Sequence, residues 1–194
     1  MSGPRLLAVT AAAAIAIAAW AGIPRGHAAP PRVYGVSVAG ASGAPEFATA
    51  FAAGGDRVIT VAHVLDAGRT VTVDGRRAAV VRVDRRDDLA VLTVPGLNAE
   101  SIRTGTGSIG PVRLLARPAR VRRAFTAIVR VDPQTPPARR PALDLDAAVA
   151  GGDSGAPVIG RDGRVVGVLF AASRDRARTA YAVDGTAVAA LLRR

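Results

Sequence analysis

Three residue types that together perform nucleophilic catalysis occur in this chain, each in a short and distinctive stretch of sequence. Ser154 lies in GGDSGAP, and a serine hydroxyl attacks a carbonyl carbon at neutral pH only when a neighbouring base removes its proton. His63, in VITVAHVL, is the only histidine after residue 28 and therefore the only candidate for that base. Asp88, in RRDDLAVL, supplies a carboxylate that would fix the imidazole tautomer. The three residues together predict acyl-transfer chemistry with Ser154 as the nucleophile.

Each of these residues has a simpler structural interpretation when it is considered alone. A histidine at a strand end is commonly a partly buried structural residue, and Asp88 alone would be a turn residue that caps a strand. The glycine-rich segment alone would be a tight turn with a polar tip. The occurrence of all three in one chain favours the catalytic interpretation.

The two glycines that precede Asp153 have a chemical role in this interpretation. Glycine tolerates backbone angles that let neighbouring amide groups point at one position. We expect the amides of Gly152 and Ser154 to form an oxyanion hole, in which two N–H donors stabilise the negative charge of a tetrahedral intermediate.

The elements that must position these residues are short apolar stretches separated by Gly, Pro, Asp and Arg, a pattern typical of closely spaced strands. The segment 96–110 is poor in such stretches, so we interpret it as a linker between two small antiparallel β units. The last residues, GTAVAALLRR, carry apolar residues at helical spacing and predict a short C-terminal helix.

The three blocks together resemble the trypsin-like (chymotrypsin-fold) serine proteases, and most closely the compact bacterial peptidases of the high-temperature-requirement type. TVAHVL is similar to the family's Thr-Ala-Ala-His block, DLAVL to its Asp-Ile-Ala-Leu block, and GDSGAP to its Gly-Asp-Ser-Gly-Gly-Pro block. The chain order His, Asp, Ser is that of the chymotrypsin template and not that of subtilisin or the α/β-hydrolases. The resemblance implies an all-β fold of two packed six-stranded antiparallel β-barrels. We expect the first barrel over 33–95, the linker over 96–110, and the second barrel with the C-terminal helix over 111–194.

This resemblance also implies a specificity pocket and an endopeptidase activity without a metal or cofactor. The position six residues before the nucleophile, at the base of the pocket, is Ala148, and the segment LFAAS contributes Ala171 and Ala172 to one wall. Thr179 is the candidate for a further wall. We therefore predict cleavage after small or medium apolar residues, although Asp144 and Asp146 would change the polarity if the alignment slipped by two residues.

Two departures from the family pattern limit this analogy. Ala156 replaces a glycine, and we expect the chain to lack the PDZ domain typical of high-temperature-requirement proteases. In the trypsins proper, an aspartate at the position of Asp153 receives a new N-terminal ammonium after activation. The stretch RVYG faintly resembles such a cleavage site, so cleavage before Val33 is one hypothesis; a simple first strand is the alternative that the residues favour.

In the N-terminal residues 1–28, Arg5 is followed by an unbroken apolar run over 6–23 and then, after Pro24 and Arg25, by small residues. This pattern predicts an export signal, either cleaved near Ala28 or retained as a membrane anchor. We therefore expect the remaining chain to function outside the cytoplasm, secreted or anchored to the cytoplasmic membrane.

The net charge of +11 comes from 26 basic residues, all of them arginine, against 15 acidic residues. Arginines cluster over 113–123 and 138–142, which suggests contact with an anionic envelope polymer or lipid, although a solvated surface is the simpler interpretation. Few aromatic residues are present, so specific nucleic-acid recognition is not expected. With no cysteine and one histidine after residue 28, no metal site is expected. A catalytically silent trypsin-fold module that binds an envelope partner is the alternative function.

Overall fold

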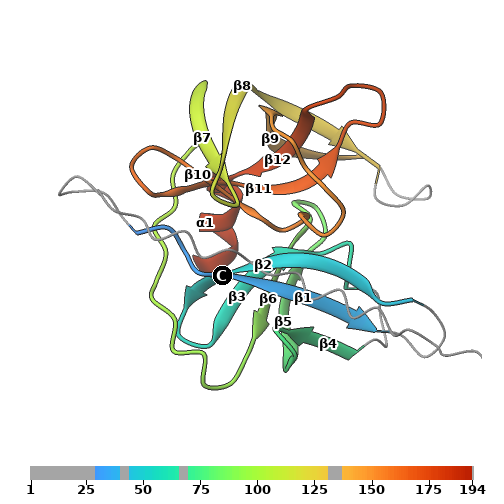
Figure 1. Cartoon of the computed structure of the whole chain (residues 1–194), viewed down its shortest axis with the longest axis vertical. Coiled ribbons are helices and arrows are strands. Elements are labelled where there is room, and N and C mark those ends of the chain that lie inside the picture. The colour runs from blue at the N-terminus through green and yellow to red at the C-terminus, as the bar shows by residue number, and fades with distance from the viewer. Residues whose placement is uncertain (1–28, 40–43, 66–69, 131–136, 194) are drawn as a thin grey trace, which may run out of the picture.

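The structure is a computed structural model that describes residues 29–39, 44–65, 70–130 and 137–193. These residues form two antiparallel six-stranded sheets, each closed into a barrel, and one helix (Figure 1). In Figure 1 the barrel of the later strands lies above the barrel of the earlier ones. The predicted all-β fold with two packed barrels and a short C-terminal helix is confirmed.

The first barrel has the strand order β1-β2-β3-β6-β5-β4, and pairing of β1 with β4 closes it. A two-residue hairpin turn joins β4 to β5. Asp74 and Gly75 in this turn have φ angles of 46° and 76°, and both are positive, as a type I′ turn requires. The strands are β1 (Val33–Ala39), β2 (Glu46–Gly54), β3 (Arg57–Val61), β4 (Thr70–Val73), β5 (Arg76–Asp84) and β6 (Leu89–Thr93).

The second barrel has the order β10-β11-β12-β9-β8-β7 and is closed by pairing of β10 with β7. The turn between β7 and β8 also has two positive φ angles, at Leu115 and Ala116, although neither residue type favours them. The residue types at this hairpin therefore do not predict a turn. The strands are β7 (Gly110–Leu114), β8 (Arg117–Val129), β9 (Ala138–Asp146), β10 (Pro157–Ile159), β11 (Val165–Ala172) and β12 (Thr179–Asp184).

The segment between the barrels is fixed at both ends by backbone pairing. Ala99 forms an isolated bridge with Gly55 of the first barrel, and Thr104 forms one with Val165 of the second. The Gly107 amide also donates a hydrogen bond of 2.8 Å to the Asp184 carboxylate. This crossing therefore ties the two barrels together before β7 begins.

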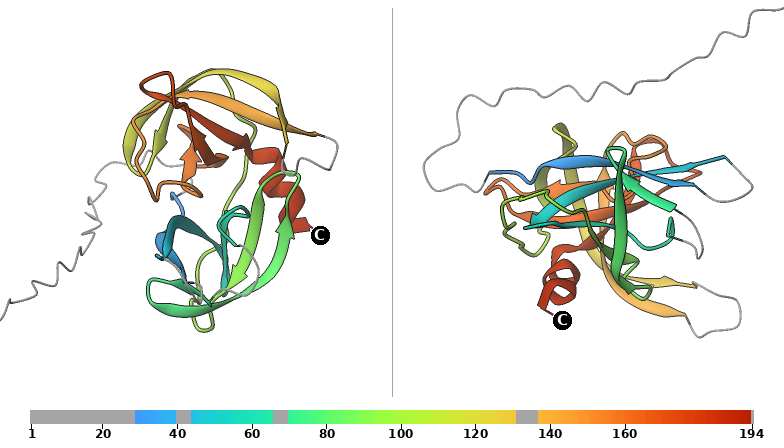
Figure 2. Two further views of the ribbon diagram at one scale, coloured as in Figure 1. Left: turned by 90° about the vertical axis from the view of Figure 1, so that its right-hand side faces the viewer. Right: turned by 90° about the horizontal axis from the view of Figure 1, so that it is seen from below.

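The helix α1 (Gly185–Arg193) joins the barrels on another side (Figure 2, left). Its buried residues Val188 and Leu191 belong to one apolar cluster with Leu92 of β6 and Val168 of β11. Arg82 of β5 donates a hydrogen bond of 2.7 Å to the carbonyl of Leu191. Because this cluster contains residues of both barrels, burial of apolar surface holds their relative orientation.

Candidate active site

The side chains of His63 and Asp88 are hydrogen-bonded at one end of the first barrel. β3 and β6 are antiparallel, with Val61 opposite Leu89, so the residues just after β3 and just before β6 emerge at the same edge. The Asp88 Oδ2 atom lies 2.8 Å from His63 Nδ1, and Asp88 Oδ1 accepts a bond of 2.9 Å from the His63 amide. One carboxylate therefore fixes both the ring and the backbone of His63.

This geometry determines which imidazole nitrogen is available as a base. Because a carboxylate can only accept a hydrogen bond, Nδ1 of His63 carries the proton and Nε2 is left with its lone pair. The side chain of Asp88 is 13% exposed and that of His63 is 46% exposed. The hydrogen bond that Nδ1 donates to Asp88 raises the pKa of His63 above its ordinary value, with the charges of Asp88 and Glu46 adding to it, while burial and the Arg140 cation oppose the rise.

The loop that carries Ser154 is attached to the first barrel by Thr49 of β2. The Thr49 amide donates to the Ser154 carbonyl at 2.7 Å, and the Thr49 hydroxyl donates to the Gly152 carbonyl at 2.8 Å. The Thr49 carbonyl in turn accepts a bond of 2.8 Å from the hydroxyl of Thr60, three residues before His63. This chain of bonds brings the serine loop to the part of the first barrel that carries His63.

Glycine is required at two positions of this loop. Gly152 and Gly155 both have a φ of 90°, a conformation that residues with a Cβ rarely adopt. A Cβ atom at Gly155 would also collide with the Thr49 carbonyl and crowd the Thr60 hydroxyl. The close approach of the loop to the first barrel therefore depends on the absence of a side chain at Gly155.

Ser154 is half-buried in a loop whose amides at Asp153 and Gly155 donate to backbone carbonyls. Among the residues that the structure describes, no hydrogen bond joins Ser154 to His63, and the amides of Gly152 and Ser154 donate to no protein group. Catalytic hydrogen bonds are often long in the absence of substrate. The two amides are thus available as the donors that the sequence predicted.

Sequence reasoning missed Thr49 and Thr60. Neither residue type is distinctive in a β-strand, and their role depends on a contact between segments more than one hundred residues apart. Thr60 lies inside the block TVAHVL, which is the one sequence feature that placed it near the site.

Comparison with known proteins now places this arrangement in a family. Residues 48–168, more than half of the chain, match the family described as trypsin-like peptidase domain. The chain belongs to the trypsin-like peptidase family. Serine protease Rv3671c of Mycobacterium tuberculosis strain H37Rv is 36% identical over 163 residues, which cover 74% of this chain and 41% of that protein. The chain therefore spans about two fifths of the length of the curated relatives it matches.

Solved structures of trypsin-like peptidases have the same fold. The active form of the Rv3671c protease superposes with a TM-score of 0.72 at 27% identity, covering 91% of this chain and 92% of that one. An inactive form of the same protease gives 0.67 at 32% identity, covering 82% and 87%. The HtrA-type protease AlgW with a tripeptide gives 0.65 at 20% identity, covering 85% and 60%, and this likeness concerns the fold alone.

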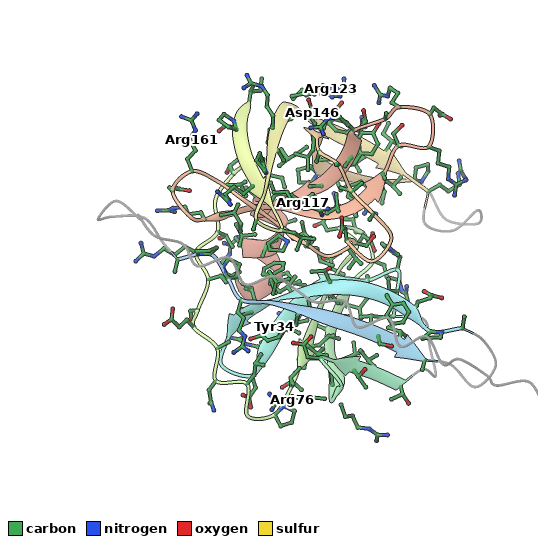
Figure 3. The ribbon with its side chains drawn as sticks, viewed as in Figure 1. Tyr34, Arg76, Arg117, Arg123, Asp146 and Arg161 are labelled. Carbon is green, nitrogen blue, oxygen red and sulfur yellow. The ribbon has the colours of Figure 1, made fainter. Side chains whose placement is uncertain are left out.

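In this member of the trypsin-like peptidase family, an arginine forms an ion pair with the carboxylate of Asp153. The Arg117 Nη2 atom lies 2.6 Å from Asp153 Oδ2, which also accepts a bond of 2.9 Å from the Ala150 amide. Figure 3 labels Arg117 at the start of β8. Val33, by contrast, lies in β1 opposite Phe51. The hypothesis that cleavage before Val33 supplies an ammonium for Asp153 therefore finds no support, and the first-strand alternative describes the segment.

We predict that Arg117→Gln lowers kcat/KM by several-fold to about ten-fold, because Asp153 loses a charge-assisted hydrogen bond next to the serine loop. The same substitution at Arg164, which forms an exposed pair with Asp162 at 3.1 Å in the same barrel, is the matched control and is expected to have no effect. Steady-state kinetics on both variants check the prediction. Equal activities for the two variants would contradict it.

The four residues predicted for the specificity pocket lie at or beside one end of β11 and β12. Thr179 is buried, Ala171 is half-buried, and Ala148 and Ala172 are exposed. Ala172 pairs with Ala180, the residue after Thr179, and Ala148 follows the end of β9, where Thr179 pairs with Asp146.

Charged side chains lie beside Thr179, and the sequence analysis did not predict them there. The Arg122 Nη1 atom donates to the Thr179 hydroxyl at 3.2 Å, and its Nη2 atom lies 3.4 Å from Asp146. Arg178 lies 3.0 Å from the same carboxylate. Asp144 is instead buried and paired with Arg123. This wall is therefore more polar than predicted, with two cations beside one carboxylate.

Neither a metal cluster nor a membrane span is found in the described part of the chain. No group of three or more His, Cys, Asp or Glu side chains there has the arrangement of a metal site. No described helix is long and apolar enough to cross a bilayer. The predicted export segment, residues 1–28, lies outside the described residues.

Proposed function

We propose that this protein is a serine endopeptidase in which Ser154, His63 and Asp88 form the catalytic triad. The observation that carries the proposal is the 2.8 Å bond between Asp88 and Nδ1 of His63, combined with attachment of the Ser154 loop to the same barrel. This bond leaves Nε2 of His63 as the base, as the triad mechanism requires. Membership of the trypsin-like peptidase family supports the same assignment.

In the proposed acylation step, Oγ of Ser154 attacks the scissile carbonyl carbon while Nε2 of His63 takes the hydroxyl proton. The amides of Gly152 and Ser154 stabilise the oxyanion of the tetrahedral intermediate. The imidazolium then donates its proton to the leaving amine, and the C–N bond breaks to give an ester on Ser154. Asp88 stabilises the imidazolium throughout but keeps its own charge.

In the deacylation step, a water molecule attacks the ester carbonyl and gives its proton to His63. The second tetrahedral intermediate collapses with return of this proton to Oγ of Ser154, which releases the carboxylic acid. The serine is regenerated, so each cycle consumes one water molecule for each peptide bond that is cleaved, and the steps need no metal or cofactor.

Reaction with a fluorophosphonate tests this proposal, because the probe forms a stable bond only with an activated serine. We expect the purified full chain to be labelled and peptide mapping by mass spectrometry to place the adduct on Ser154. His63→Ala is expected to abolish labelling in a folded protein. Absence of labelling in a folded wild-type chain, or an adduct on another residue, would contradict the proposal.

We further propose that the pocket accepts small or medium apolar side chains and rejects basic ones. Ala148 offers no carboxylate to a substrate arginine or lysine, and Arg122 and Arg178 beside Thr179 repel cations. A peptide panel that varies the residue before the cleaved bond is the test, with Ala148→Asp as the variant expected to gain turnover of basic substrates. Preferential cleavage after arginine by the wild type would contradict this specificity.

Export remains a proposal that rests on the apolar run in residues 1–28. We expect cell fractionation to find the full chain outside the cytoplasm, and a chain without residues 1–28 to stay inside. The N-terminal mass of the exported protein then distinguishes a cleaved signal from a retained anchor. Cytoplasmic location of the full chain would contradict the proposal.

We propose contact with an anionic polymer or lipid more weakly than the sequence suggests, because ion pairs within the protein already neutralise several arginines of the two clusters. Four arginines of the two clusters are engaged with carboxylates. Salt-dependent binding of the protein to anionic and neutral vesicles tests what remains, and equal binding to both would remove this partner. The four arginines are Arg117, Arg122, Arg123 and Arg140.

A further inference from the structure

Arg140 of β9 is a cation buried between the two barrels, and the triad mechanism does not use it. Its side chain is 2% exposed, and it is the largest of the fully buried side chains in the described residues. Burying a guanidinium is costly unless an opposite charge lies close to it. The position of Arg140 therefore points to a specific partner.

That partner is Asp88 of the first barrel. The Arg140 Nη1 atom lies 3.7 Å from Oδ2 of Asp88, the same oxygen that lies 2.8 Å from Nδ1 of His63. The guanidinium carbon lies 5.3 Å from the centre of the Phe170 ring of β11, a distance at which an aromatic face attracts a cation. Nε of Arg140 is buried and has no hydrogen-bond partner. Asp88 thus lies between a histidine of its own barrel and an arginine of the other.

We propose that Arg140 is a positioning residue of the active site, which holds the Asp88 carboxylate toward His63 across the interface between the barrels. This inference rests on the proposed function of the triad. It assigns Arg140 no contact with substrate and no part in proton transfer. Its effect is exerted through its contact with Asp88 and through the charge that it places near His63.

The charges around this pair determine the direction of the expected effect. Asp84, Asp87 and Asp88 act on Arg140 from the first barrel, and burial lowers the pKa of Arg140 while these carboxylates oppose the fall. Around His63, Asp88 and Glu46 raise the pKa, and Arg140 lowers it. While Asp88 keeps its bond to Nδ1, removing the Arg140 charge therefore moves the pKa of His63 upward. A general base with a higher pKa is protonated over a wider pH range, so the acid limb of activity moves to higher pH.

The strand that carries Arg140 also leads to the nucleophile. β9 ends at Asp146, a few residues before the loop of Gly152 and Ser154. On the neighbouring turn, Arg86 donates a hydrogen bond of 3.2 Å to the carbonyl of Arg139, so β9 is attached to the first barrel beside Arg140. A shift of one barrel relative to the other would move Arg140 away from Asp88.

The test compares Arg140→Met and Arg140→Gln with Arg139→Gln, in which the adjacent, exposed arginine loses its charge. We expect both Arg140 variants to lower kcat/KM at neutral pH by roughly ten-fold or more, with a smaller effect on KM, and to move the acid limb to higher pH. Arg140→Lys restores a cation and is expected to lie closer to the wild type. The Arg139 control is expected to keep the wild-type rate and pH profile.

A measurement without substrate separates this inference from the proposed function. The ring protons of His63 are followed by NMR against pH in full chains that also carry His27→Gln, so that a single histidine is observed. In folded Arg140→Met or Arg140→Gln, weakening of the hydrogen bond between the His63 Nδ1 proton and Asp88, read from the resonance of that proton, supports the role of Arg140 even if the wild type hydrolyses no peptide. A bond that stays as in the wild type in whichever of the two variants folds would overturn it, and a titration moved to higher pH by itself reports only the lost charge.

Discussion

Ser154→Ala is expected to lower kcat/KM for peptide hydrolysis by roughly 10⁶-fold, the size of effect known for removal of a triad nucleophile. The variant has no oxygen to form the acyl-enzyme, while the oxyanion amides and the pocket remain. The melting temperature is expected to stay close to that of the wild type, because the loop is held by backbone groups of Gly152 and Ser154.

Ser108→Ala is the matched control, since this serine is exposed on the crossing between the barrels and is not one of the residues proposed for the triad or the pocket. We expect its activity to be unchanged. Peptide hydrolysis by Ser154→Ala at more than about one hundredth of the wild-type rate would exclude Ser154 as the nucleophile.

Asp88→Asn is expected to lower kcat/KM by about 10⁴-fold, because the amide favours the wrong imidazole tautomer. The carboxylate accepts from both the ring and the amide of His63, and an asparagine cannot accept both bonds with its single oxygen. Since the bond from Asp88 is the main cause that raises the pKa of His63, the acid limb of the residual activity is expected to move to lower pH.

This direction is opposite to the one expected for the Arg140 variants, which makes the pair of pH profiles informative. Asp162→Asn is the control, because that carboxylate forms only an exposed pair with Arg164. Measurement of kcat/KM against pH for the wild type, Asp88→Asn and Asp162→Asn checks the prediction. An acid limb of Asp88→Asn at the same pH as that of the wild type, or an activity within ten-fold of the wild type, would contradict it.

The proposed chemistry of the site is a prediction from the sequence, because three short blocks carry its residues. The histidine, the aspartate and the glycine-flanked serine each lie next to an apolar strand, and local strand and turn geometry determines how each side chain leaves its barrel. The hydrogen bond between His63 and Asp88 follows from this, because the pairing of Val61 with Leu89 brings their neighbours to one edge.

The supporting residues were not readable in the same way. Thr49 holds the serine loop, Arg117 occupies the carboxylate of Asp153, and Arg140 lies behind Asp88. In the sequence the arginines belong to clusters that suggest a solvated basic surface. Only the packing of the barrels distinguishes the buried cation from its exposed neighbour Arg139.

The sequence by itself therefore determined the family, the all-β architecture and the three residues of the proposed triad, because these depend on local patterns repeated in a fixed chain order. The tertiary structure alone decided the partners of those residues and the charges beside Thr179. Such contacts join strands that are distant in sequence, and their burial changes the energy of a charge far more than its residue type does. For this reason a net charge of +11 does not indicate that one arginine lies beside the aspartate of the proposed triad.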